Sequence, residues 1–182
     1  KFPAHQFAWK VLGSVLNQMG RKEESLGASQ KSVELAPLDA EAHNNLGNAL
    51  KELGRLNEAA ESYKSALALK SDYAQAHSNL GITLTELGRL KEAEVSFKQA
   101  ITSRPGFSEA YFNLGNTYRE LGKFEEAKSC YTQAIERRAD YSEAHFNLGI
   151  TLKDLGRLQE AETTFRKTLT LTPNFLEVHN NL

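Results

Sequence analysis

Histidine is the residue type whose spacing in this chain most resembles a metal-binding motif. Four histidines share one position of a 34-residue period: His43, His77, His145 and His179. Zinc ligands must lie about 2 Å from one ion, whereas equivalent positions in successive pairs of packed helices are separated by roughly 8–10 Å per helix. We therefore predict no metal site and interpret these histidines as half-buried packing residues.

Nucleophilic catalysis has equally little support. Cys130 is the only cysteine in the sequence. A small residue holds the equivalent position in the other 34-residue intervals: Ala28, Ser62, Ser96 and Thr164. The sequence contains no Gly-rich phosphate loop, no nucleophile elbow and no paired metal-ligand motif. We predict that the chain is not an enzyme, has no catalytic residues and needs no cofactor.

The asparagines of the sequence favour ligand binding rather than catalysis. One asparagine recurs with the same period, at Asn45, Asn79, Asn113, Asn147 and Asn181. Asparagine inside a helix costs up to ~0.7 kcal/mol relative to alanine, so the repetition needs an explanation. A carboxamide carries both a donor and an acceptor and can pair with the N–H and C=O of an extended chain. The spacing predicts an asparagine ladder that holds a polypeptide by its backbone. The alternative is that these residues only solubilise the surface.

Other residues beside the ladder are candidates for the same surface. Asn48 lies on the same helical stripe as Asn45, and Asn116 holds the equivalent position two periods later. Phe112 and Phe146 directly precede two ladder residues, at a position that is polar elsewhere in the sequence. Exposed aromatic rings are common anchors for partner side chains, so we predict this role for both. The alternative is lateral packing against the next helix.

The internal repeat that sets this period positions all of these side chains. The four prolines share one register, Pro3, Pro37, Pro105 and Pro173, and ten of the 12 glycines occupy two others. Within 41–53, apolar residues fall at i, i+4, i+7, i+8 and i+11, which is one stripe of an α-helix. Gly54 can supply a left-handed cap, and a second helix is expected over 56–69. Since no segment alternates with period two, we predict an all-α fold.

A 34-residue helical hairpin with these landmarks resembles the tetratricopeptide repeat. Trp9, Leu12 and Gly13 fit the opening W-x-x-L-G of that family. The A-x-x-x-aromatic pattern fits at Ala59–Tyr63, Ala93–Phe97, Ala127–Tyr131 and Ala161–Phe165. The resemblance implies an α-solenoid of antiparallel helical hairpins stacked into a right-handed superhelix. We expect a single array made of 1–5 (tail of a preceding repeat), repeats at 6–39, 40–73, 74–107, 108–141 and 142–175, and 176–182 (start of a sixth).

A narrower resemblance concerns the ladder. An asparagine before Leu–Gly, with an aromatic residue before the next helix, is similar to the superhelix of O-GlcNAc transferase and its bacterial relatives. In that family an asparagine ladder holds the backbone of the substrate polypeptide, and this role transfers here to the five ladder residues. The catalytic glycosyltransferase portion of that family has no counterpart in the sequence, so no activity transfers.

Charge and hydropathy limit the partners. With 22 Lys and Arg against 23 Asp and Glu the net charge is -1, which argues against binding nucleic acid or a membrane surface by bulk charge. No run of 18 apolar residues could span a membrane, and the single cysteine favours a reducing, cytoplasmic compartment. We predict a protein-protein interaction module that binds an extended polypeptide of unknown identity in a concave groove. Alternatives are a substrate-docking arm of a larger enzyme, such as a glycosyltransferase, and a self-assembling scaffold.

Both ends of the sequence stop within a repeat, so we expect a piece of a longer protein. Each repeat buries its apolar stripe against its neighbour, and an interrupted array exposes two unmatched faces. These faces contain Phe2, Phe7 and Val11 at the start and Phe175, Val178 and Leu182 at the end. We expect weak head-to-tail self-association through them.

Overall fold

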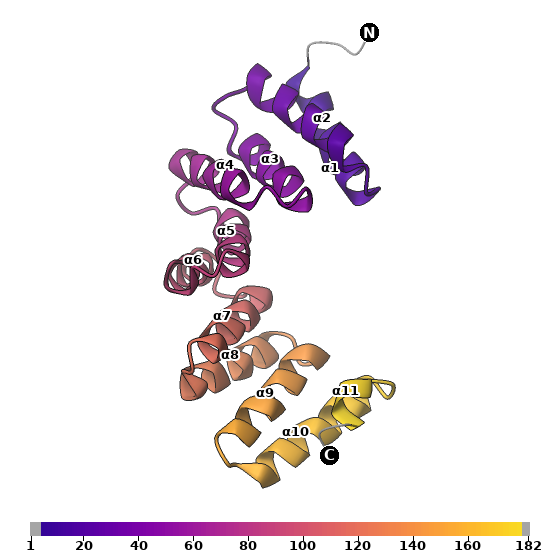
Figure 1. The fold of residues 1–182 in the computed structure, drawn as a ribbon, viewed down its shortest axis with the longest axis vertical. Coiled ribbons are helices and arrows are strands. Elements are labelled where there is room, and N and C mark those ends of the chain that lie inside the picture. Colours follow the sequence, from indigo (N-terminus) through magenta and orange to yellow (C-terminus); the bar gives the residue numbers. More distant parts are fainter. Residues whose placement is uncertain (1–4, 180–182) are drawn as a thin grey trace. The chain divides into compact units, whose positions relative to one another are not determined.

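The computed structural model describes residues 5–179, and this part of the chain is helical throughout, without strands (Figure 1). The helices are α1 (Gln6–Gln18), α2 (Lys22–Leu35), α3 (Ala40–Glu52), α4 (Leu56–Leu69), α5 (Ala74–Glu86), α6 (Leu90–Ser103), α7 (Ser108–Glu120), α8 (Phe124–Arg137), α9 (Ser142–Asp154), α10 (Leu158–Leu171) and α11 (Leu176–His179). The all-α prediction is confirmed. None of these helices is long and apolar enough to cross a membrane.

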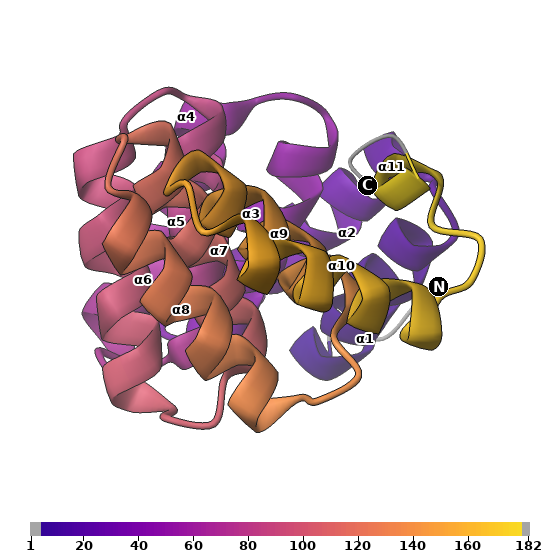
Figure 2. The ribbon, with the colours of Figure 1, turned by 90° about the horizontal axis from the view of Figure 1, so that it is seen from below.

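Consecutive helices pack in pairs, and each pair is one hairpin: α1 with α2, α3 with α4, α5 with α6, α7 with α8, and α9 with α10. The hairpins fall into two compact units. Unit 1 is 1–103 and contains α1 to α6, and unit 2 is 104–182 and contains α7 to α11. The short α11 packs against α10, and Figure 2 shows the loop that connects the two helices.

The turn inside each hairpin depends on a glycine with a left-handed backbone. Gly54 has φ 73° and follows the end of α3. Four more glycines, with φ of 72° to 75°, end the first helices of the other hairpins: Gly20, Gly88, Gly122 and Gly156. The Arg55 N–H donates to the Leu50 carbonyl at 2.9 Å, which closes the end of α3. The predicted glycine cap is therefore confirmed, because only glycine adopts this φ without strain.

A glycine packed against an aromatic ring sets the distance between the two helices of a hairpin. The Tyr63 and Phe165 side chains are buried. A Cβ atom on Gly47 would lie 2.6 Å from Cε1 of Tyr63, and one on Gly149 would lie 2.5 Å from Cε1 of Phe165. No side chain fits at these positions, so the ring lies directly on the backbone of the first helix.

The first hairpin replaces this ring by a serine. Ser29 is buried at the position of the aromatic residue, and a Cβ atom on Gly13 would lie 2.8 Å from its hydroxyl oxygen. The Ser25 hydroxyl donates to the Gly13 carbonyl at 2.8 Å. A side chain–backbone hydrogen bond here joins two helices that elsewhere are joined by ring packing.

Within each unit the first helices of successive hairpins also touch one another. In unit 1, α3 contacts both α1 and α5, and in unit 2, α7 contacts α9. The second helices of the described hairpins do not approach each other to the same degree. The first helices therefore form the more closely spaced row in each unit.

The C-terminal end of the described chain is partly covered by its own residues. Val178 of α11 is buried in a cluster with Leu152 and Phe165, and Phe175 packs against the same cluster. Leu176 is 74% exposed. Leu182, like Phe2 at the other end, lies outside the described residues.

Candidate peptide-binding surface

The asparagine ladder lies on the first helices of four hairpins. Asn45 is in α3, Asn79 in α5, Asn113 in α7 and Asn147 in α9. All four side chains are partly buried. The fifth predicted member, Asn181, lies outside the described residues.

In unit 1 the ladder residue Asn79 is bonded to the preceding hairpin. Its Nδ2 donates to Oδ1 of Asn48 and to Oδ1 of Asn44, both at 3.0 Å. The Tyr63 hydroxyl donates to the same Asn48 oxygen at 2.8 Å. Gln75 donates to Oδ1 of Asn79 at 3.1 Å. We call Asn48, Tyr63 and Asn79 the first amide site.

Unit 2 repeats this arrangement two periods further along the chain. Nδ2 of Asn147 donates to Oδ1 of Asn116 at 2.9 Å, and the Tyr131 hydroxyl donates to the same oxygen at 2.7 Å. We call Asn116, Tyr131 and Asn147 the second amide site. In both units a ladder asparagine thus links one hairpin to the next, and the predicted residues Asn48 and Asn116 are its acceptors.

The two amide sites could have been recognised in the sequence from the pairing of residue types between the two helices of a hairpin. This pairing does not repeat every 34 residues. Where the second helix has a tyrosine, the first helix has an asparagine: Asn48 with Tyr63, and Asn116 with Tyr131. Where the second helix has a phenylalanine, the first helix has an isoleucine: Ile82 with Phe97, and Ile150 with Phe165. A buried hydroxyl needs a hydrogen-bond partner and a phenyl ring does not. The asparagine–tyrosine pair therefore recurs every two hairpins.

Several amide groups in and beside the ladder donate to no acceptor within the described chain. Within 5–179 the side chains of Asn45 and Asn113 form no hydrogen bond, and Nδ2 of Asn48 and of Asn116 donates to no protein acceptor. The oxygen atoms of Asn48 and Asn116 each accept two hydrogen bonds, which fixes both amide planes. Their Nδ2 groups are therefore oriented donors without an acceptor from the described chain.

Phe112 and Phe146 pack at the joints between hairpins. The Phe112 ring centroid lies 5.9 Å from that of Tyr131 and 4.9 Å from that of Tyr141. The Phe146 centroid lies 6.0 Å from Phe165 and 5.0 Å from Phe175. Both rings therefore pack laterally against neighbouring rings of the protein, which was the alternative to anchoring a partner side chain. Each ring remains partly exposed.

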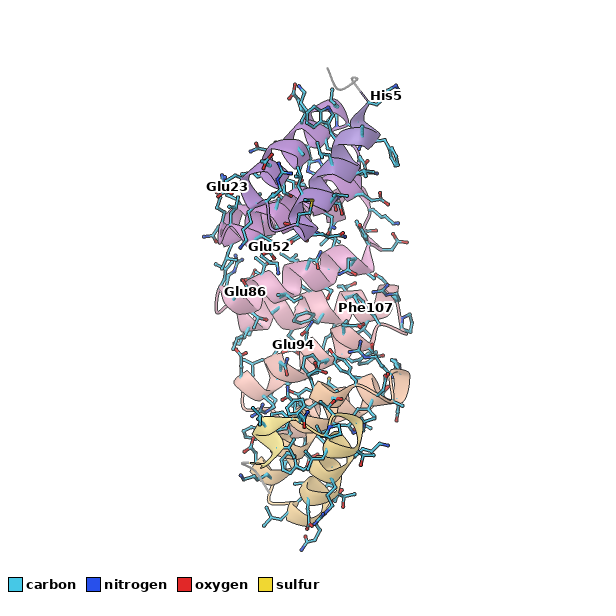
Figure 3. The ribbon with its side chains drawn as sticks, turned by 90° about the vertical axis from the view of Figure 1, so that its right-hand side faces the viewer. His5, Glu23, Glu52, Glu86, Glu94 and Phe107 are labelled. Carbon is cyan, nitrogen blue, oxygen red and sulfur yellow. The ribbon has the colours of Figure 1, made fainter. Side chains whose placement is uncertain are left out.

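Different charged groups act on the buried tyrosines of the two amide sites. Burial raises the pKa of Tyr63, and the negative charges of Glu86 and Glu52 raise it further. Figure 3 shows these two glutamates at the same edge of unit 1. Burial also raises the pKa of Tyr131, but there the positive charge of Arg119 opposes the rise. The charges that act on Tyr63 are therefore carboxylates, whereas a guanidinium acts on Tyr131.

Three of the recurring histidines contact backbone carbonyls. His43, His77 and His145 place Nε2 within 2.9–3.0 Å of the carbonyl oxygen six residues earlier. This contact closes the loop that precedes the helix. The side chain of His179 is not described. Among the described residues no group of three or more His, Cys, Asp or Glu side chains could hold a metal ion.

The fourth hairpin, which has Tyr111 in place of the histidine, satisfies the equivalent carbonyl differently. The Arg137 Nε donates to the Pro105 carbonyl at 2.6 Å. The Arg137 guanidinium also lies over the Tyr111 ring, 4.1 Å from its centroid. The loop carbonyl is therefore satisfied in the fourth hairpin too, by a residue that the sequence pattern does not single out.

Comparison with known families agrees with the hairpin geometry. Models described as TPR or tetratricopeptide repeat match residues 28–61, 47–88, 72–140 and 112–174. The chain is a tetratricopeptide-repeat protein. Proteins of this family generally mediate protein–protein interaction by binding protein or peptide partners. No curated protein matches the sequence.

Solved structures of tetratricopeptide-repeat proteins are similar over nearly the whole chain. MamA shares 23% identity with a TM-score of 0.82, over 91% of this chain and 97% of MamA. PilF of Pseudomonas aeruginosa shares 24% identity with a TM-score of 0.84, over 91% of this chain and 75% of PilF. YrrB, a TPR protein with an unusual peptide-binding site, shares 21% identity with a TM-score of 0.79, over 98% and 92%. At these identities the likeness shows the fold.

Proposed function

We propose that this tetratricopeptide-repeat protein binds an extended polypeptide along the first helices of each unit, through the open amides of the ladder residues Asn45 and Asn113 and of the neighbouring Asn48 and Asn116. One observation carries the proposal. Nδ2 of Asn48 and of Asn116 is held in a fixed orientation by two hydrogen bonds to the oxygen of the same amide, yet donates to no described acceptor. Both donors are therefore oriented and available to a ligand.

The amide chemistry suits a peptide backbone. An extended chain presents C=O and N–H groups that secondary structure would otherwise satisfy. Nδ2 of Asn116 can donate to a peptide carbonyl, and the neighbouring Asn113 offers both a donor and an acceptor. Because the Asn116 side chain is already immobilised by Tyr131, binding costs little additional side-chain entropy. Recognition of this kind depends weakly on the side chains of the partner.

The test separates the open amides from those that join hairpins. We expect Asn45→Ala combined with Asn113→Ala to bind a random library of blocked decapeptides several-fold more weakly, measured by fluorescence anisotropy. Asn48→Asp keeps an oxygen for Tyr63 but loses Nδ2, and we expect it to weaken binding in unit 1. Asn57→Ala is the matched control, because Asn57 is exposed on the second helix α4. Unchanged binding by the double variant, at unchanged helix content, would place the peptide elsewhere.

Self-association is a second candidate, favoured by the outer face of α1. Phe7 is 69% exposed and Met19 is 62% exposed, and Val11 and Val15 are exposed between them. A cavity of about 410 Å³ lies along this face. Thr83 in α5 occupies the repeat position equivalent to Val15, and it is fully buried where α5 packs against the preceding hairpin. A second copy of the chain could cover α1 in the same way, and sedimentation velocity across a hundredfold concentration range tests this.

A docking arm for a glycosyltransferase would use the same amides. The narrower resemblance to O-GlcNAc transferase stays a prediction, as does the absence of catalysis in this chain. Both are tested by adding a peptide and a radiolabelled UDP-sugar to the purified chain. Peptide binding without sugar transfer is the expected result.

A further inference from the structure

We propose that the second amide site also binds an acidic side chain of the polypeptide, through the guanidinium of Arg119. The inference rests on the proposed function and deepens it, because it names the chemistry of the partner in unit 2: an extended peptide with an aspartate or glutamate next to the backbone held by Asn116.

Arg119 lies on α7 one helical turn after Asn116, so both side chains project from one face of the helix. Its positive charge acts on Tyr131, where it opposes the rise in pKa that burial causes. Arg119 therefore lies beside the second amide site.

The hydrogen-bond donors of Arg119 are poorly satisfied. Its Nε is buried and has no hydrogen-bond partner among the described residues. The nearest carboxylate is that of Asp154, whose Oδ2 lies 3.6 Å from Nη2, too far for a hydrogen bond. A buried donor without an acceptor is unfavourable. Arg119 is thus held near a negative charge without the paired hydrogen bonds that a guanidinium can form.

A ligand carboxylate supplies what Arg119 lacks. A guanidinium presents donors in a planar fork that matches the two oxygens of a carboxylate. The Arg119 side chain is 31% exposed, so the group can turn toward a peptide and bring Nε with Nη2 onto one carboxylate. Asp154, at 36% exposure, is the internal competitor that such a ligand would displace.

The first amide site lacks this chemistry, which makes the preference specific to unit 2. Lys51 holds the position of Arg119, and an ammonium group has no planar fork. Glu86 holds the position of Asp154, and together with Glu52 it places negative charge around Tyr63. Glu120 in turn holds the position of Glu52, so both sites carry one cation and two carboxylates. The planar guanidinium of Arg119, in place of the Lys51 ammonium, is therefore what favours a ligand carboxylate at the second amide site.

The experiment uses two blocked pentapeptides, acetyl-Ala-Ala-Glu-Ala-Ala-amide and its glutamine counterpart. Binding to the whole chain is followed by NMR at the Arg119 Nε–H and at the side-chain amides of Asn116 and Asn48. We expect the glutamate peptide to bind the second amide site about fivefold more tightly, the size expected of a half-exposed ion pair. Arg119→Gln should abolish the difference while retaining binding of the glutamine peptide. Arg166→Gln, at an exposed arginine of the same unit, is the control and should preserve it.

Asp154→Asn gives the sharper readout, because a purely structural role would not produce it. Removing the internal competitor should tighten the glutamate peptide by about two- to threefold, a change within the range of an exposed ion pair, and leave the glutamine peptide unchanged. Equal binding of both peptides to the wild type would overturn the carboxylate site and leave backbone recognition standing. Loss of both peptides in Arg119→Gln would make Arg119 a structural residue and overturn it as well. If neither peptide binds the wild type, the proposed function falls too.

Discussion

At the residue scale, a buried tyrosine hydroxyl dictates the partner on the facing helix. Tyr131 is fully buried, and its hydroxyl donates to Asn116. The equivalent Phe165 has no hydroxyl, and its facing residue is Ile150. The Tyr–Asn pair buries a hydroxyl together with its hydrogen-bond acceptor, and the Phe–Ile pair buries only apolar groups. Neither kind of hairpin therefore leaves a buried polar group of this pair unpaired. Only the tyrosine kind leaves an oriented amide at the surface.

A double-mutant cycle measures this coupling. Tyr131→Phe should cost about 1 kcal/mol, the net contribution of one hydrogen bond. Asn116→Ile should cost more, because it leaves a buried hydroxyl unpaired. The double variant, which copies the Phe165 and Ile150 pair, should be more stable than the sum of the two single changes predicts. The free energies of unfolding are measured in urea, and strict additivity would contradict the pairing.

Two glycines in helices should respond oppositely to alanine. A Cβ atom on Gly81 would lie 2.7 Å from Cε1 of Phe97, so Gly81→Ala should destabilise the chain by about 1–3 kcal/mol, as overpacked cores do. Gly27 in α2 is exposed, and a Cβ there meets nothing within 4 Å. Gly27→Ala should therefore stabilise the chain by up to ~1 kcal/mol. Thermal unfolding compares the two, and equal shifts would refute the steric account.

At the element scale, one pair of positions sets the chemistry of each joint between hairpins. Phe112 with Tyr141 and Phe146 with Phe175 are pairs of rings that occupy equivalent positions at successive joints. The same two positions at the joint between α1 and α3 hold Lys10 and Asp39, whose Nζ and Oδ2 lie 3.0 Å apart. This joint is therefore polar and sensitive to pH, whereas the joints in unit 2 are aromatic.

Acid should weaken the joint between α1 and α3. Burial of the Asp39 carboxyl tends to raise its pKa. Hydrogen bonds from Lys10, the Ala42 N–H and Gln6 outweigh this, together with the Lys10 charge, and the pKa lies below its ordinary value. A lowered pKa stabilises the folded state at pH values above the unfolded value, about 3.9. This contribution is lost as the pH falls through the folded value.

Asp39→Asn should therefore destabilise the chain at pH 7, and the difference from the wild type should shrink below pH ~4. Asp72→Asn is the control, since Asp72 is exposed in the loop before α5. Urea unfolding at pH 7, 4 and 2.5 provides the measurement. A gap between the wild type and Asp39→Asn that stays constant with pH would show that the carboxylate charge is irrelevant.

The elements themselves were predictable because their signals are local. The apolar stripe of 41–53 and the cap at Gly54 depend on residues within one helix and its turn, and α3 with its cap lies where they place it. The hydrogen bond from Asn79 to Asn48 joins residues 31 apart on different helices. No periodicity within one hairpin encodes that contact. The recurrence of the ladder asparagines could be seen in the sequence. The hydrogen bonds by which Asn79 and Asn147 join successive hairpins could not.

At the scale of the whole molecule, each compact unit carries one amide site. Asn48, Tyr63 and Asn79 lie in unit 1, and Asn116, Tyr131 and Asn147 lie in unit 2. The third and fifth hairpins have Ile82 and Ile150 at the position of Asn48, and a hydrocarbon side chain offers a peptide no hydrogen bond. The number of binding sites should therefore follow the asparagine–tyrosine pairs rather than the number of repeats.

Stoichiometry tests this directly. A blocked pentapeptide is short enough to occupy one amide site, so the glutamine peptide should bind with two molecules per chain in isothermal titration calorimetry. Asn116→Asp keeps an oxygen for the Tyr131 hydroxyl but removes the open Nδ2, and should reduce the ratio to one without lowering helix content. Asn48→Asp should do the same from the other unit. A ratio near five, or one that neither change reduces, would mean that every hairpin binds alike and that the amide sites serve only to join them.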